Sequence, residues 1–355
     1  MVSKNPSESD KQPAFTLGGR DIAAGSRETV DLPVSVLSDH TPVTLSVHVV
    51  HGKLPGPTLF VSAAVHGDEV IGVEIVRRLL KSPSLKKISG TLLAVPIVNA
   101  FGFLNHSRYL PDRRDLNRSF PGSPSGSMAS RLANLFMEQV VTKSDVGIDL
   151  HSAAIHRTNF PQIRISSDDP RAKKLANVFA APITLESQLR PGSLRGASEE
   201  KNVPVLLYEA GESLRFDELS ARSGLSGILR IMRHLDMLSA TRKPEPKLTT
   251  LHSSSSRWLR APGGGLLRGH RTIGDRVKEG DLLGTISDPF GESEIPLHAT
   301  FDGLVIGRTN LPIVYEGDGL FHVASIENNV NVARKLDQTT SLVAEGVALD
   351  EDEII

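Results

Sequence analysis

Apolar and polar positions along the chain predict strands and helices that follow one another in turn. Four apolar runs, rich in β-branched residues, are each long enough for one buried strand: 59–65, 91–98, 146–150 and 203–208. Apolar positions at helical spacing predict helices over 70–81, 127–141, 170–179 and 216–238. Alternating strands and helices are typical of the α/β class, so we expect a sheet flanked by helices.

The character of the sequence changes near its ends and after residue 245. Residues 1–29 form a polar N-terminal segment, whose first part offers little apolar surface to bury. Residues 30–245 carry the α/β pattern and form the predicted main domain. Residues 246–329 contain short strands with frequent glycines, which predicts an all-β sandwich, and 330–355 form an acidic tail.

The stretch LFVSAAVHGDEVIGVE at 59–74 predicts a buried strand that enters a helix through a glycine-containing turn. His66 and Glu69 lie in this turn, at the carboxyl end of the strand, where ligands collect in open α/β sheets. His151 ends another predicted strand. If the two strands are neighbours, two imidazoles and a carboxylate meet in the ligand set of hydrolytic zinc sites. Asp149 and Asp68 could orient these ligands by accepting an imidazole N–H.

Composition narrows the function classes. Lys and Arg number 40 against 41 for Asp and Glu, so no net field favours nucleic acid or an anionic membrane. The sequence has no cysteine, so a metal must be held by His, Asp or Glu. The polar start does not resemble a secretory signal, and no apolar run is long enough to span a bilayer, so we expect a cytoplasmic protein.

Four motifs occur in an order that resembles one known family. HGDE at 66–69, DLNRSFPG at 115–122, DLHS at 149–152 and YEAGE at 208–212 are similar to the succinylglutamate desuccinylase/aspartoacylase group of zinc carboxypeptidase-like hydrolases. The resemblance covers roughly residues 40–330. It implies a zinc-carboxypeptidase-like mixed sheet flanked by helices, with 30–245 as the catalytic domain.

The resemblance also implies a metal site and a general base. His66, Glu69 and His151 would hold one Zn²⁺ per chain. Glu209 would take a proton from the attacking water and pass it to the leaving amine. Taken alone, His151 would more often be a hydrogen-bonded core histidine, and Glu209 has a rival in Glu212, which lies further into the next element.

A long polar loop at 105–126 would complete the implied site. Arg108 would face the developing oxyanion of the tetrahedral intermediate, although Arg113 and Arg114 compete for this role. Asn117 and Arg118 would hold the α-carboxylate of the substrate, because a guanidinium matches a planar carboxylate. The alternative is that Asn117 and Arg118 only tie the loop down.

The activity implied by the resemblance is hydrolysis of the amide bond of a small N-acyl amino acid. One alternative is a metallocarboxypeptidase that trims peptide C-termini, and another is an inactive binding or scaffold protein. The motifs identify neither the acyl group nor the amino acid, and the sequence is compatible with a monomer or a homo-oligomer.

The C-terminal region carries a second resemblance. GDRVKEGDLLGTISD at 274–288 and HATFDGLVIG at 298–307 look like the biotinyl/lipoyl type of barrel-sandwich, which this hydrolase group often carries after its catalytic domain. In carrier proteins, the hairpin between these halves presents a modified lysine. Here residues 289–294 contain no lysine, so we expect a structural or lid role.

Overall fold

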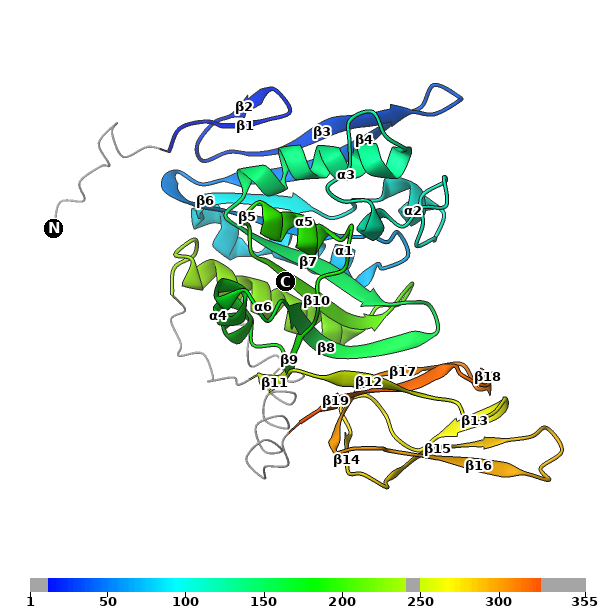
Figure 1. Ribbon diagram of the computed structural model, residues 1–355. Coiled ribbons are helices and arrows are strands. Elements are labelled where there is room, and N and C mark those ends of the chain that lie inside the picture. The colour runs from blue at the N-terminus through cyan, green and yellow to red at the C-terminus, as the bar shows by residue number, and fades with distance from the viewer. Residues whose placement is uncertain (1–11, 241–249, 327–355) are drawn as a thin grey trace.

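The computed structural model describes residues 12–240 and 250–326 (Figure 1). The first part of the polar N-terminal segment, residues 241–249 and the acidic tail 330–355 lie outside the described residues. Within the described ranges, no helix is long and apolar enough to cross a membrane.

A mixed sheet of 13 strands forms the centre of the molecule, with the main order β12-β19-β17-β8-β10-β7-β5-β6-β4-β3. Strands β10, β7, β5 and β6 are parallel to one another, whereas β8 pairs antiparallel with β10, and β4 pairs antiparallel with both β6 and β3. The predicted mixed α/β fold is therefore confirmed. The strands of the main domain are β1 Phe15–Leu17, β2 Arg20–Ile22, β3 Arg27–Val36, β4 Pro42–His51, β5 Leu54–Ala63, β6 Ser89–Val95, β7 Val146–Ala153, β8 Arg157–Ile165, β9 Ile183–Glu186 and β10 Val205–Glu212.

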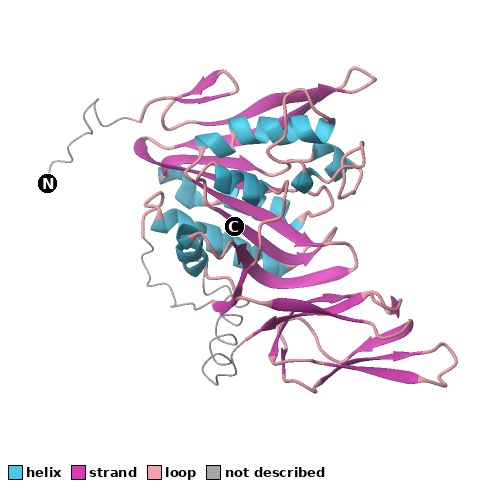
Figure 2. Ribbon diagram, viewed as in Figure 1, coloured by secondary structure: helices cyan, strands magenta, loops and turns pink. Residues whose placement is uncertain are grey.

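Helices cover both faces of this sheet (Figure 2). One core packs α1, α4 and α6 against the sheet, and a second core packs α2, α3 and α5 against the opposite face. Because the central parallel strands are covered on both sides, they are rich in apolar residues, as the predicted runs indicated. The helices are α1 Ile71–Lys81, α2 Ala100–Leu104, α3 Met128–Gln139, α4 Pro170–Phe179, α5 Leu194–Glu200 and α6 Glu218–His234.

The C-terminal region extends this sheet and adds another. β12, β17 and β19 belong to the 13-stranded sheet, because β17 pairs antiparallel with β8 of the main domain. A separate sheet has the order β16-β15-β13-β18, and side chains from both sheets share one apolar core. The strands are β11 Leu251–Ser253, β12 Ser256–Arg260, β13 Gly265–Gly269, β14 Arg276–Val277, β15 Leu282–Ser287, β16 Glu294–His298, β17 Gly303–Thr309, β18 Ile313–Val314 and β19 Gly319–Ser325. We call residues 250–326 the C-terminal module; the predicted domain limits and the likeness to biotinyl/lipoyl domains stay predictions.

Several elements differ from the predicted pattern. The segment 1–29, which was predicted only to be polar, contains the hairpin β1–β2. This hairpin is stabilised by Leu17 and Ile22, whose side chains are fully buried against the sheet. The sequence pattern indicates only a short strand at 162–166, whereas β8 begins at Arg157, and the pattern does not predict α2, β9 or α5. Short elements of this kind carry too few apolar residues to show a period in the sequence.

Candidate active site

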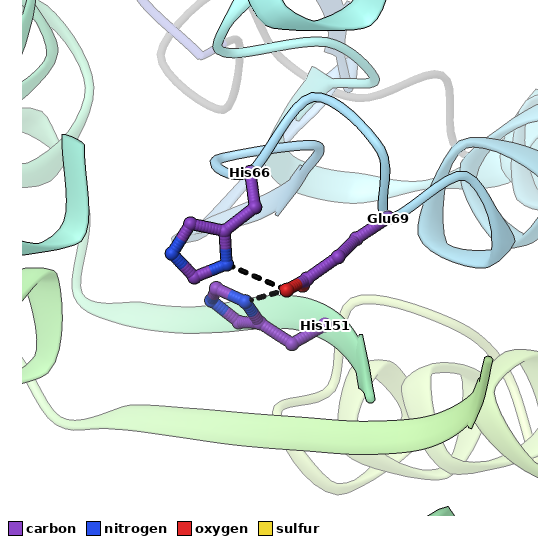
Figure 3. A group of neighbouring side chains, drawn as sticks. All are labelled: His66, Glu69 and His151. Atoms are coloured by element: carbon purple, nitrogen blue, oxygen red, sulfur yellow. Dashed lines mark hydrogen bonds and ion pairs between the residues drawn. The ribbon is translucent and has the colours of Figure 1, made fainter. Parts of the chain in front are cut away.

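His66, Glu69 and His151 meet at the carboxyl ends of β5 and β7, which are adjacent parallel strands (Figure 3). The Nδ1 atom of His66 lies 2.6 Å from one carboxylate oxygen of Glu69, and Nδ1 of His151 lies 2.7 Å from the other. All three side chains are buried, and their donor atoms lie within 4.8 Å of one another. As predicted, the ends of two strands that are distant in sequence lie side by side and bring these three residues together.

The turn that carries His66 and Glu69 requires a glycine. A Cβ atom on Gly67 would lie 2.0 Å from the carbonyl carbon of Gly102 in α2, a distance at which no side chain can be accommodated. Gly67 therefore lets the turn pack directly against the backbone of α2. This close approach fixes the direction in which His66 leaves the strand.

Carboxylates on the far side of each imidazole orient the two rings. His151 Nε2 lies 2.8 Å from Asp149, which also accepts a 2.8 Å hydrogen bond from Ser62. His66 Nε2 lies 3.1 Å from Asp115. Because each Nε2 faces an outer carboxylate, Nδ1 is the ring nitrogen that each histidine turns toward Glu69.

The residues that orient the two rings were only partly predicted. Asp149 takes the position expected for it, but Asp68 does not contact either imidazole. Its Oδ1 atom is buried and has no hydrogen-bond partner among the described residues. Asp115 orients His66 instead. The sequence contained a signal for it, because Asp115 opens the DLNR motif.

The donor set fits a divalent cation. Burial by itself lowers the pKa of both imidazoles, but the adjacent carboxylates outweigh it, so the pKa of His66 and that of His151 are raised. The two imidazoles in turn hold the pKa of Glu69 below its usual range, despite burial of this carboxyl group. When two imidazoles and a carboxylate lie this close together, bound protons can be replaced by a metal ion that the same nitrogen and oxygen atoms coordinate. His66, Glu69 and His151 could therefore hold one.

A cavity of about 730 Å³ opens from these three residues. Its size is that of a pocket for a small ligand. Six arginines line it, against three glutamates, one of which is Glu69. The arginines are Arg108, Arg118, Arg157, Arg164, Arg190 and Arg195. Such a lining favours an anionic ligand.

The three predicted loop residues all line this cavity. Arg108 lies beside the metal-ligand cluster, with Nη1 3.3 Å from Glu69 and Nη2 3.0 Å from Asp115. Asn117 accepts a 2.9 Å hydrogen bond from the backbone N–H of Leu194, so its amide group also ties the loop to α5. Arg118 is exposed and lines the cavity. Arg113 and Arg114, which compete with Arg108 for the oxyanion role, do not line it.

Glu209 and Glu212, the rivals for the base, occupy different environments at the end of β10. Glu209 lines the cavity, and its backbone is paired with that of His151 on β7. Glu212 is absent from the cavity lining. Its carboxylate accepts hydrogen bonds from the backbone N–H of His156 and from Asn310 of the C-terminal module, both at 2.9 Å.

Other cavity residues come from segments in which the sequence showed no motif. Asn159 and Arg164 project from β8, Arg195 from α5, and Trp258 from β12 of the C-terminal module. Trp258 is stacked on His322, with ring centroids 4.9 Å apart, and the guanidinium of Arg157 lies 5.0 Å from its ring. The C-terminal module therefore forms part of the cavity wall.

Comparison with known sequences identifies relatives of this chain. Residues 55–235, just over half of the 355 residues, match the succinylglutamate desuccinylase/aspartoacylase catalytic domain. An N-alpha-acetyl-L-2,4-diaminobutyric acid deacetylase from Halomonas elongata is 26% identical over 283 residues, which cover 76% of this chain and 83% of that protein.

Solved structures share the fold over most of the chain. The product-bound ectoine utilization protein EutE (DoeB) from Ruegeria pomeroyi is 25% identical with a TM-score of 0.74, covering 84% of this chain and 94% of that one. A succinylglutamate desuccinylase/aspartoacylase from Rhodobacter sphaeroides is 23% identical, also with a TM-score of 0.74, covering 85% of this chain and 96% of that one. The similarity extends beyond the matched catalytic domain.

Proposed function

The chain belongs to the succinylglutamate desuccinylase/aspartoacylase family, and from this premise we propose that it is a zinc-dependent hydrolase of the amide bond in N-acyl amino acids. The observation that carries the proposal is one cavity that contains the His66–Glu69–His151 cluster, Glu209 and an excess of arginines. The Halomonas relative, named as a deacetylase of an N-acetylated amino acid, supports the same reaction class.

His66, Glu69 and His151 would hold the zinc ion, with Asp115 and Asp149 orienting the two rings. Bound there, zinc would supply Lewis acidity that makes water nucleophilic near neutral pH. Glu209 accepts the proton that the attacking water loses, and it returns that proton to the departing amine. Arg108 donates hydrogen bonds to the carbonyl oxygen of the substrate as negative charge develops on it.

Asn117 and Arg118 bind the α-carboxylate of the substrate. The Oδ1 atom of Asn117 is occupied by the backbone of Leu194, so its amide nitrogen is the group that faces a carboxylate. Arg118 adds a charged donor from the next position in the chain. An anchored carboxylate places the amide bond at a fixed distance from Glu209 and Arg108.

The cavity wall favours small substrates over peptide C-termini. Residues 254–256 and Trp258 of the C-terminal module line the cavity together with residues of the main domain. A long peptide would have to pass this wall. Assays with free N-acyl amino acids and with peptides of increasing length test this preference, and efficient release of C-terminal residues from long peptides would favour the carboxypeptidase alternative.

A screen of acetyl-, succinyl- and other N-acyl amino acids, scored by amine release and paired with metal analysis of the purified protein, tests the proposal. We expect about one zinc ion per chain and turnover of at least one substrate class that carries a free carboxylate. Protein without bound zinc at neutral pH and without activity on any of these compounds would support the binding-protein alternative.

Replacing Arg118 by alanine is expected to raise KM about 10- to 100-fold with little change in kcat, because a charge-assisted hydrogen bond to the carboxylate is lost. Steady-state kinetics of the N-acyl amino acid measure both constants. Arg114→Ala is the matched control from the same loop, since Arg114 is exposed and does not line the cavity. On a substrate whose α-carboxylate is replaced by a carboxamide, Arg118→Ala should add no further loss; an equal loss would contradict the clamp.

Replacing Asp149 by asparagine is expected to lower zinc affinity about 10- to 100-fold, because carboxylates that orient ligating imidazoles contribute to metal binding to this extent. Competition against a chelator of known affinity measures the change. Asp168→Asn, an exposed carboxylate outside the cavity, serves as the control. Unchanged zinc affinity in Asp149→Asn would mean that the Asp149–His151 contact does not support the metal site.

A further inference from the structure

The carboxylate of Glu209 is held from the neighbouring strand β8. Its Oε2 atom accepts a 2.6 Å hydrogen bond from the side-chain amide of Asn159. Its Oε1 atom lies 3.4 Å from Nη1 of Arg164, a longer and weaker contact. Asn159 is therefore the closest partner of the proposed base, and it is buried at the cavity wall.

Asn159 also lies against the C-terminal module. β17 pairs with β8 such that Gly307 stands opposite Asn159. A Cβ atom on Gly307 would lie 2.8 Å from the Oδ1 atom of Asn159, so the absence of a side chain at this position leaves the room that the amide group occupies. The backbone of Gly307 is outside the left-handed region, so space rather than conformation explains the glycine.

The other neighbours of Gly307 cannot easily move. The same Cβ atom would lie 3.3 Å from Cβ of His322 and 3.4 Å from the backbone oxygen of Thr158. His322 is fixed by stacking on Trp258 and by a 2.9 Å hydrogen bond to Ser256. A methyl group at position 307 would therefore displace the side-chain amide of Asn159, the nearest of the three groups.

We propose that Asn159 is a positioning residue for Glu209 and that strand β17 of the C-terminal module keeps the Asn159 amide in place through Gly307. The module thus contributes to catalysis without touching the reacting atoms. This inference rests on the proposed function, because it assigns the orientation of the proposed general base. It predicts an effect on kcat, since Asn159 aligns Glu209 and does not bind the substrate.

The test is a double-mutant cycle of Asn159→Ala and Gly307→Ala in the full chain, with kcat, KM, zinc content and melting temperature measured for each variant. We expect Asn159→Ala to lower kcat about tenfold, the loss of one hydrogen bond to a charged group, with KM and zinc content unchanged. Gly307→Ala should lower kcat in the same direction. In the Asn159→Ala background, Gly307→Ala should cause no further loss of kcat, because the group that it displaces is gone.

Asn310→Ala is the matched control. Asn310 joins the C-terminal module to the main domain by hydrogen bonds to Thr158 and Glu212, but it does not contact Glu209. We expect it to leave kcat unchanged. An equal loss of kcat in Asn310→Ala would mean that loosening the module in general, rather than losing the Asn159 amide, lowers the rate, and would overturn the proposal.

Other outcomes also separate the alternatives. A rise in KM without a fall in kcat in Asn159→Ala would make Asn159 a substrate-binding residue, and additive losses of kcat in the cycle would remove the role of Gly307. If Gly307→Ala does not fold, the double variant should recover folding, because the clash with Oδ1 is removed; failure to recover it contradicts the inference. If Glu209→Gln is inactive while Asn159→Ala and Gly307→Ala turn over normally, this inference fails but the proposed function stands.

Discussion

A His66→Ala variant is expected to lose its zinc and about 10³-fold or more of kcat/KM, because the metal contributes several kcal/mol of transition-state stabilisation. His66 is better suited to this test than His151. Its outer partner Asp115 keeps a charged partner, Arg108, at 3.0 Å after the substitution, whereas the buried Asp149 beside His151 would keep only the hydroxyl of Ser62. Metal analysis, kinetics and circular dichroism of the purified variant measure the three relevant quantities.

The control for His66→Ala is His270→Ala, which removes an exposed imidazole of the C-terminal module. It should keep both zinc and activity. Extracting zinc from the wild-type protein with a chelator should reproduce the kinetic loss, and adding zinc back should restore the wild-type protein but not His66→Ala. Full activity in a folded, zinc-free His66→Ala protein would exclude the proposed mechanism.

The sequence predicted the parts of the molecule that depend on local patterns. The apolar runs before His66 and His151 identified the two central strands, and their ends proved adjacent because β5 and β7 pair in parallel. The resemblance carried by four motifs is confirmed by the match over residues 55–235. Motifs at strand ends are informative because topology brings such ends to one edge of the sheet.

Contacts between distant elements could not be predicted in this way. Nothing in the sequence pattern of β8 shows that it pairs with β17, about 150 residues further along the chain. The sequence alone therefore assigns no role to Asn159. Asp68 is nearer to His66 in sequence, but the carboxylate that reaches Nε2 of His66 is Asp115 of the DLNR motif. Sequence distance is a poor guide to which carboxylate reaches an imidazole Nε2, because the loop that carries Asp115 folds back over His66.

A Glu209→Gln variant is expected to keep zinc and to lose about 10²- to 10⁴-fold of kcat with little change in KM, the range that a positioned general base contributes. The substitution preserves the size of the side chain, and the glutamine carbonyl can still accept the hydrogen bond from Asn159. What is lost is the ability to accept a proton from water. The kinetic constants, with zinc content measured on the same preparation, separate this effect from damage to the metal site.

Glu212→Gln is the control for the Glu209→Gln variant. Glu212 lies three positions further along the same motif, and its carboxylate joins β10 to His156 and Asn310 rather than facing the cavity. Glutamine there can still accept one of these hydrogen bonds, so we expect a small loss of melting temperature and unchanged kcat. The reverse result, with Glu212→Gln inactive and Glu209→Gln active, would transfer the base to Glu212 and would require the end of β10 to rearrange when substrate binds.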